Sequence, residues 1–113
     1  MTTPQKRKGS AFELEVARFL QGAGFPHAER AYGAGRQDDR GDIDGLPGLV
    51  IECKNHKTHD LSGWLDEAER ERNNARADYG VVVVKRRGKA AAKAYAVLTL
   101  EDFARLWAER DGR

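Results

Sequence analysis

The sequence predicts an α/β domain in which helices flank a central mixed β-sheet, in the order α-β-β-β-α-β-β-α. Three segments carry apolar residues at helical spacing, and short apolar or β-branched runs bounded by turn residues separate them. The length of 113 residues fits one domain, and we expect a basic N-terminal arm at residues 1–9 before a single folded domain at residues 10–113.

The expected helices begin and end at recognisable signals. The first starts near Ser10 and stops at Gly22, which a further glycine and a proline closely follow. The second covers about residues 61–77, and the third follows Thr99, whose hydroxyl is a favourable N-cap. The strands are expected at residues 27–32, 42–44, 49–54, 81–85 and 94–100, and the valine run VVVVK is typical of a strand buried on both faces.

Composition restricts the class of protein. Hydrophobic residues make up 40% and charged residues 34% of the chain, and the net charge is +2. No apolar run approaches the roughly 20 residues of a membrane span, and the N-terminal MTTPQKRKGS lacks the apolar stretch of a secretory signal. The single Cys53 excludes an intramolecular disulfide framework. We therefore expect a cytoplasmic protein with no membrane partner.

The segment GDIDGLPGLVIECKN, residues 41–55, reads as a β-hairpin that carries an unusual amount of charge. Side chains alternate between the two faces of a strand, so the pairing register decides which residues are buried. Pairing residue 42 with 52 separates apolar from charged residues, whereas a shift of one position would bury the acids. We therefore predict this register. Its apolar face comprises Ile43, Leu49, Ile51 and Cys53, and its charged face comprises Asp42, Asp44, Glu52 and Lys54.

Spacing alone leaves two interpretations of the charged face open. Opposed carboxylates in a sheet repel each other unless a cation lies between them, and their oxygens suit Mg²⁺ or Mn²⁺. Lys54 could instead balance the charge of a solvated, salt-bridged face. Glu13 poses a similar choice, because it lies on the apolar stripe of the first helix, where a carboxylate requires a partner. It belongs either to a site or to a capping box with Ser10.

Three short motifs occur in a meaningful order: Glu13 within KGSAFELEVARFL, GD at 41–42 and IECK at 51–54. Together they resemble the signature of the PD-(D/E)XK nuclease superfamily. With Arg30 included, the sequence is most similar to the archaeal-type and phage Holliday junction resolvases, over roughly residues 6–55. Gly41 stands where the pattern has a proline, which is not a ligand in the family.

The resemblance implies a restriction-endonuclease-like core, Mg²⁺-dependent hydrolysis of phosphodiester bonds and a homodimer. Asp42 and Glu52 would be metal ligands, together with the backbone carbonyl of Cys53 and with Glu13, directly or through a water. Lys54 would orient the attacking water or stabilise the charged phosphate. Metal ions held by carboxylates can activate water and neutralise the phosphoryl group, and Mn²⁺ is expected to substitute for Mg²⁺.

Basic residues are candidates for contacts with DNA phosphates, which position a duplex without reading its sequence. Arg30 is the strongest candidate because it also fits the resemblance. A separate basic cluster at residues 85–89 is either a polyanion footprint or solvated surface charge. The other candidates, each of which could equally be a solvated charge, are Lys6, Arg7, Lys8, Arg36 and Arg40.

Several conspicuous residues have a structural interpretation that we favour over a functional one. His56 and His59 are expected in a solvated loop, because two histidines without cysteines or i, i+4 spacing are a weak indication of a transition-metal site. Trp64 and Trp107 are expected in the core or at a dimer interface. Cys53 is expected to be a packing residue rather than a nucleophile.

The expected function is that of a metal-dependent, structure-selective DNA endonuclease, most similar to a Holliday junction resolvase of DNA recombination and repair. A four-way junction has near two-fold symmetry, so a symmetric dimer that carries two sites matches it. Two alternatives stay open: another PD-(D/E)XK nuclease of repair or restriction type, and a non-catalytic nucleic-acid-binding domain of this fold. The complete set of acids and lysine favours an enzyme over the second alternative.

Overall fold

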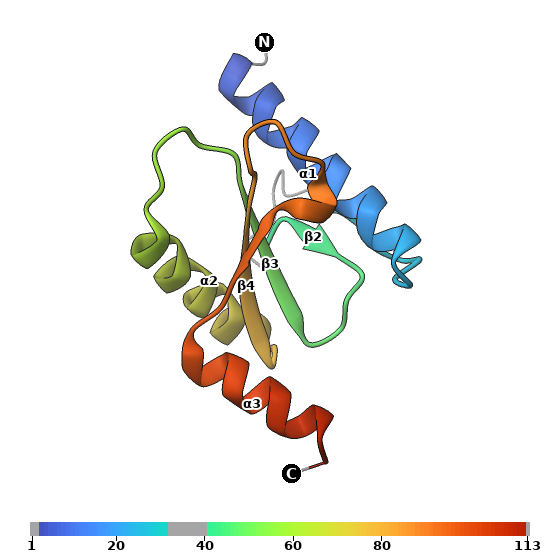
Figure 1. The fold of residues 1–113 in the computed structure, drawn as a ribbon, viewed down its shortest axis with the longest axis vertical. Coiled ribbons are helices and arrows are strands. Elements are labelled where there is room, and N and C mark those ends of the chain that lie inside the picture. The colour runs from blue at the N-terminus through green and yellow to red at the C-terminus, as the bar shows by residue number, and fades with distance from the viewer. Residues whose placement is uncertain (1–2, 32–40, 113) are drawn as a thin grey trace.

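A parallel pair of strands, β3 (Leu49–Lys54) and β4 (Tyr79–Val84), forms the centre of the fold (Figure 1). In this computed structural model, which describes residues 3–31 and 41–112, β5 (Tyr95–Val97) joins β4 in antiparallel orientation after a short 3-10 turn, η1 (Ala91–Lys93). The three-stranded sheet is therefore mixed, in the order β3-β4-β5. The predicted α/β class with helices flanking a mixed sheet is confirmed.

Helices α1 (Pro4–Gly22) and α2 (Leu61–Ala75) cover opposite faces of this sheet (Figure 1). The two faces have separate cores, because successive side chains of a strand point in opposite directions. On the α1 side, Val81 packs with Ile51 and with the apolar stripe of α1, and on the α2 side Val82 and Val84 pack with Ala68. No helix in the described ranges combines the length and apolar character of a membrane span.

Helix α1 begins earlier than the sequence predicted. Thr3 is the N-cap, its side chain accepts a hydrogen bond from the Lys6 backbone N–H at 3.2 Å, and Pro4 opens the first turn. Proline is favourable at the first helical position because its φ is already helical and its missing N–H would have had no partner there. The expected start near Ser10 is therefore wrong, residues 4–9 are helical rather than an arm, and the proposed capping box at Ser10 does not exist.

The predicted hairpin pairing is also wrong. Strand β2 (Ile43–Asp44) pairs with β1 (Glu29–Arg30) in a separate antiparallel ribbon, and the described residues contain no β2–β3 ladder. The turn explains the divergence, because its Gly48 carbonyl accepts hydrogen bonds from the backbone N–H groups of Asp78 and Tyr79 at the start of β4. The predicted apolar face is nevertheless confirmed, since its four residues, Ile43, Leu49, Ile51 and Cys53, all lie in or against the α1-side core.

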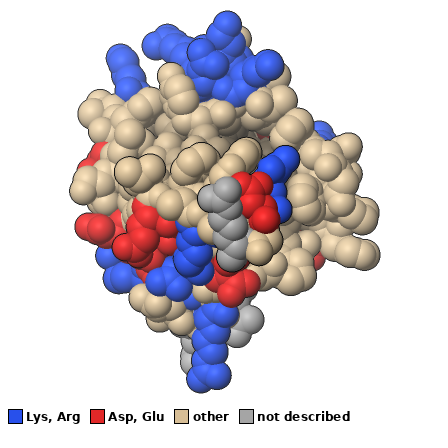
Figure 2. Space-filling model, turned by 60° about the horizontal axis from the view of Figure 1, so that its bottom comes forward, with Lys and Arg blue, Asp and Glu red and all other residues tan. Residues whose placement is uncertain are grey.

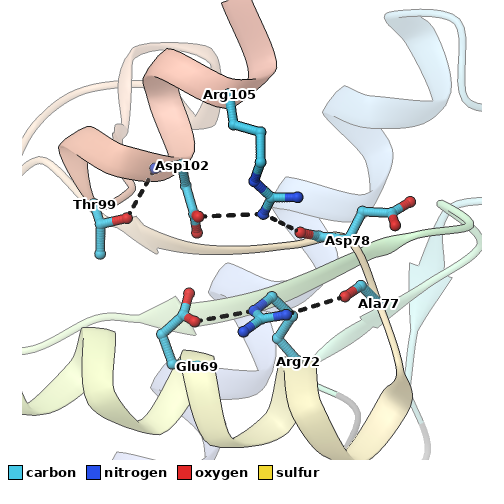
Figure 3. A network of polar contacts seen from close by, with 7 residues as sticks. All are labelled: Glu69, Arg72, Ala77, Asp78, Thr99, Asp102 and Arg105. Atoms are coloured by element: carbon cyan, nitrogen blue, oxygen red, sulfur yellow. Dashed lines mark hydrogen bonds and ion pairs between the residues drawn. The ribbon is translucent and has the colours of Figure 1, made fainter. Parts of the chain in front are cut away.

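Helix α3 (Leu100–Arg110) is attached to the rest of the fold mainly by polar contacts (Figure 3). Thr99 caps it as predicted, with its hydroxyl accepting from the Asp102 N–H at 3.1 Å. Arg105 then bridges Asp102 at 3.2 Å and the backbone carbonyl of Asp78 at 2.7 Å. Helix α3 lies at the bottom of the view in Figure 1, and most of its large apolar side chains are exposed.

We predict that Gly45→Ala destabilises the protein by more than about 1 kcal/mol. Gly45 has φ +99°, and a Cβ at this position would overlap the backbone carbonyl of His27. The strain would separate β1 from β2. Urea unfolding, compared with that of wild type, measures the loss.

Gly88→Ala is the matched control, because Gly88 also has a positive φ of +75° but nothing lies within 4 Å of its Cβ position. It should lose less stability than Gly45→Ala. Equal losses for the two variants would contradict the close approach at Gly45.

Candidate functional site

Asp42 is attached to the central strand β3 through both its backbone and its side chain. Its N–H donates to the Ile51 carbonyl at 2.7 Å, and its Oδ2 accepts from the Cys53 N–H at 2.8 Å. The carboxyl groups of Asp42 and Glu52 also lie close enough to each other for each to affect the pKa of the other. The expected proximity of Asp42 and Glu52 is therefore confirmed, although a turned side chain rather than a strand ladder produces it.

Gly41 makes this attachment possible. It has φ +94°, and a Cβ there would lie only 2.8 Å from the Ile51 carbonyl oxygen. Proline, the residue of the nuclease pattern at this position, has a fixed negative φ and could not adopt this conformation. The glycine at position 41 is thus an integral part of how this chain presents Asp42.

Glu52 and Lys54 project from β3 toward α2. Glu52 is only 5% exposed. The Lys54 Nζ lies 2.6 Å from Glu67 Oε1 and 3.8 Å from Glu52 Oε2. The predicted charged face exists at these positions, but helix α2 covers it and adds acids of its own.

Glu67 and Glu71 of α2 are site residues that the sequence analysis missed. Oxygen atoms of Glu52, Glu67 and Glu71 all lie within 4.8 Å of one another. A signal was present in the sequence, because Glu71 follows Trp64 and Ala68 at helical spacing and so lies on the apolar stripe of its helix. The same reasoning singled out Glu13.

Glu13 and Arg30 form an ion pair at the α1 side of the site. The Arg30 Nε donates to Glu13 Oε1 at 3.1 Å, and its Nη2 donates to the Ser10 hydroxyl at 3.2 Å. Glu13 is close enough to Asp42 for its charge to raise the pKa of that carboxyl. The structure therefore brings Glu13 and Asp42 together, and it directs Arg30, a predicted DNA contact, at Glu13.

Burial and crowding raise the pKa of both central carboxyl groups. Burial, supported by the charge of Glu13, raises the pKa of Asp42 to about 6, although the Cys53 N–H and Lys54 oppose this shift. Burial, the hydrogen bond with Glu71 and the neighbouring carboxylates raise the pKa of Glu52 to about 11. Burial is the largest cause of both shifts, and the negative charges of neighbouring carboxylates add to it.

Lys54 is strongly held in its charged form. Burial lowers the pKa of its ammonium group, but the hydrogen bond and charge of Glu67 and the charges of Glu52 and Asp42 outweigh burial and raise it. Lys54 is therefore a proton donor in hydrogen bonds and a fixed positive charge, not a base.

The Cys53 backbone and side chain have different surroundings. Its side chain packs against the α1-side core, and burial raises the pKa of the thiol, so the expectation of a packing residue is confirmed. Its N–H faces Asp42. Because the N–H and C=O of one strand residue point to the same edge, its carbonyl also faces the Asp42 side of β3, as a metal ligand there would require.

The other predicted residues lie around this site or outside the described part of the chain. Lys6, Arg7 and Lys8 are exposed on the first turns of α1. Arg36 and Arg40 fall outside the described residues. His56 and His59 are exposed in the loop after β3. Trp64 packs against the α2-side core. Trp107 is half-exposed on α3.

Comparisons with models of known protein families, with curated proteins and with solved structures give no match.

We predict that the metal-free protein becomes more stable as the pH falls from about 8 to about 5, by about 2 kcal/mol. The folded pKa of Glu52 is raised from 4.5 to about 11, so the folded state binds more protons than the unfolded state in this window. Stability is therefore lost as the pH rises through it. Glu52→Gln should be more stable than wild type at about pH 8 and should show a flatter pH dependence.

Urea unfolding in EDTA at the two pH values measures both effects. Glu29→Gln is the control, because Glu29 is exposed on β1 and away from the cluster. A pH dependence that is the same in wild type and Glu52→Gln would contradict the assignment of the raised pKa to Glu52.

Proposed function

We propose that this chain is a metal-dependent DNA endonuclease of the PD-(D/E)XK type, with a four-way junction as the preferred substrate. One observation carries the proposal: Asp42 lies close enough to Glu52, Lys54 and Glu13 to interact with each of them, and Lys54 Nζ lies 3.8 Å from Glu52 Oε2. These are the acids and the lysine of the nuclease signature, and they come from three separate segments. A solvated salt-bridged face, the alternative explanation, would not bury Glu52 against further acids.

The donor atoms suit a hard divalent cation. Carboxylate oxygens dominate the site, and the Cys53 thiol points away into the core. The raised pKa of Glu52 reflects its burial first and the neighbouring carboxylates second. Asp42, Glu52 and the Cys53 carbonyl would hold Mg²⁺ or Mn²⁺, and Glu13 would bind directly or through a water. Once bound, the ion would supply charge neutralisation at the phosphoryl group and a water of lowered pKa.

The protein groups have separate roles in this account. Lys54 donates hydrogen bonds to the attacking water or to a non-bridging phosphate oxygen, and Glu67 holds its ammonium group in place. Arg30 balances the charge of Glu13 and fixes its orientation. The main-chain bond from Cys53 fixes Asp42, so the carboxylates are positioned before any substrate arrives.

The distribution of positive charge supports a polyanionic substrate. Lys6, Arg7 and Lys8 are exposed on the helix that also carries Glu13. Figure 2 shows Lys and Arg side chains gathered at the top of one view of the molecule, apart from the mixed acidic and basic area below. Contacts of this kind bind DNA phosphates without reading sequence, as recognition of a branched shape requires.

A second copy of the chain is the partner that α3 favours. Leu100 is 81% exposed, Trp107 50% and Phe103 48%, and the rings of Phe103 and Trp107 stack at 6.0 Å. Among its described residues α3 buries Asp102 alone. A monomer rarely exposes such an apolar surface, and a two-fold dimer would present two sites to a symmetric junction.

We predict Mg²⁺-dependent nicking of a synthetic four-way junction, with little cutting of the matching linear duplex and none in EDTA. Asp42→Asn and Glu52→Gln should each lower the cleavage rate by at least about 100-fold, because each removes a carboxyl group that would bind the metal ion. Junction binding, measured by gel shift in EDTA, should be retained. Asp44→Asn is the matched control and should cut normally.

Other results of this assay would select another function. Equal cutting of junction and duplex would favour a repair or restriction-type nuclease. Binding of the junction without cleavage in either Mg²⁺ or Mn²⁺ would contradict the enzyme proposal and favour a non-catalytic DNA-binding domain. Normal cleavage by both Asp42→Asn and Glu52→Gln would show that the reaction occurs elsewhere.

We predict that Trp107→Ala weakens self-association by at least about tenfold, since buried tryptophans contribute strongly to interfaces. Glu109→Ala, an exposed change on the same helix, should leave it unchanged. Sedimentation equilibrium gives the dimer dissociation constants. A monomeric wild type at all concentrations, or equal constants for both variants, would contradict a dimer through α3.

A further inference from the structure

A basic pocket of about 570 Å³ lies beside the proposed active site. It is formed by the loop that follows β3, the turn that follows β4, one residue of α1 and the first residue of β5. None of the described residues that line it is an aspartate or glutamate. They are Lys8, Asn55, His56, Lys57, His59, Lys85, Arg86, Arg87, Gly88 and Tyr95.

The positive charge of this pocket is only partly balanced. Lys85 forms an ion pair with Glu15 at 3.6 Å, so one acid from α1 reduces the local charge. Arg86 bonds to the backbone carbonyl of Lys93 at 3.4 Å, a contact that leaves its charge intact. Lys57 and Arg87 are exposed. A surface with this excess of cations in a concave shape favours a phosphate group.

Aromatic rings line the same pocket. Tyr95 is 48% exposed, and the Arg86 guanidinium carbon lies 5.2 Å from the centre of its ring. The His59 ring lies 6.4 Å from that of Tyr95 and 5.8 Å from that of Trp64. Exposed rings combined with cations are the arrangement by which proteins bind nucleic acid strands whose bases are not stacked in a duplex.

Trp64 and Lys85 connect the pocket to Lys54 of the proposed active site. The Lys54 Nζ lies 5.9 Å from the centre of the Trp64 ring, which His59 also contacts. The Lys54 carbonyl accepts a hydrogen bond from the Lys85 N–H at 2.9 Å, where β3 and β4 end together. A nucleotide in the pocket would therefore lie close to the lysine that is proposed to act on the phosphate.

We propose that this pocket binds an unpaired nucleotide of a single-stranded DNA segment, with its phosphates on the lysines and arginines and its base on Tyr95 and His59. The inference rests on the proposed function for its choice of DNA, and it adds the place where an unpaired base lies. Bases inside a duplex are already stacked and cannot reach a ring within a pocket. Unpaired nucleotides at the centre or at the ends of a branched substrate can reach such a ring.

Binding of fluorescently labelled single strands in EDTA tests this proposal without any cleavage. The probes are a short oligothymidylate and an abasic strand of the same length, which has the phosphates but no bases. Tyr95→Ala should weaken oligothymidylate binding about tenfold and leave the abasic strand unaffected. Tyr95→Phe, which keeps the ring, should bind as wild type does. Arg87→Ala should weaken both strands, and more than Arg18→Ala, an exposed change on α1 outside the pocket.

Three results would overturn the proposal: equal binding by Tyr95→Ala and Tyr95→Phe, equal losses for both strands in Tyr95→Ala, or tighter binding of the corresponding RNA. Because the assay contains no metal, its outcome is separate from that of the cleavage assay. Ring-dependent binding without any cleavage would support the pocket and reject the nuclease. Cleavage of the junction, together with unchanged strand binding by Tyr95→Ala, would support the nuclease and reject the pocket.

Discussion

The hydrogen bond from the Cys53 N–H to the Asp42 carboxylate is the contact on which the site depends. The β1–β2 ribbon and the central sheet are separate in their strand pairing, so this bond and the one between Asp42 N–H and the Ile51 carbonyl join them at the site. Together they place one carboxyl group beside that of Glu52. The cost is electrostatic, because two buried acids in contact repel each other whenever both are charged.

Helix α2 increases this repulsion. Lys54 lies closer to Glu67, at 2.6 Å, than to Glu52, at 3.8 Å, so one lysine is shared between two acids. Glu71 adds a further carboxyl group beside Glu52. In a purely structural sheet face, apolar side chains in place of these acids would be more stable. Stability given up at one place in a small domain is typical of a functional site, and a divalent cation would recover it.

The sequence predicted which side chains share a face of a strand, but it did not predict the contacts that depend on tertiary packing. The faces of β3 followed from the period of a strand and the need to keep Ile51 in the core. The closeness of Asp42 and Glu52 was predicted from a strand pairing that does not exist, and the bond from the Cys53 N–H to the Asp42 side chain produces it instead. The pairing partner of β2 could not be predicted in this way, because the turn before β3 bonds to the start of β4 through the Gly48 carbonyl, and these segments are distant in the sequence. Glu67 was missed because the rotation of α2 over the sheet decides whether a flanking residue faces β3. The early start of α1 was missed for a local reason, the cap at Thr3.

We propose above that these carboxylates hold a divalent cation. Anomalous diffraction from a crystal soaked in Mn²⁺ tests it most directly, because the signal locates the ion without reference to activity. A bound Mn²⁺ ion should give a peak between the carboxylates of Asp42 and Glu52, within bonding distance of the Cys53 carbonyl oxygen. No peak, or a peak only between Glu67 and Glu71 on α2, would contradict it.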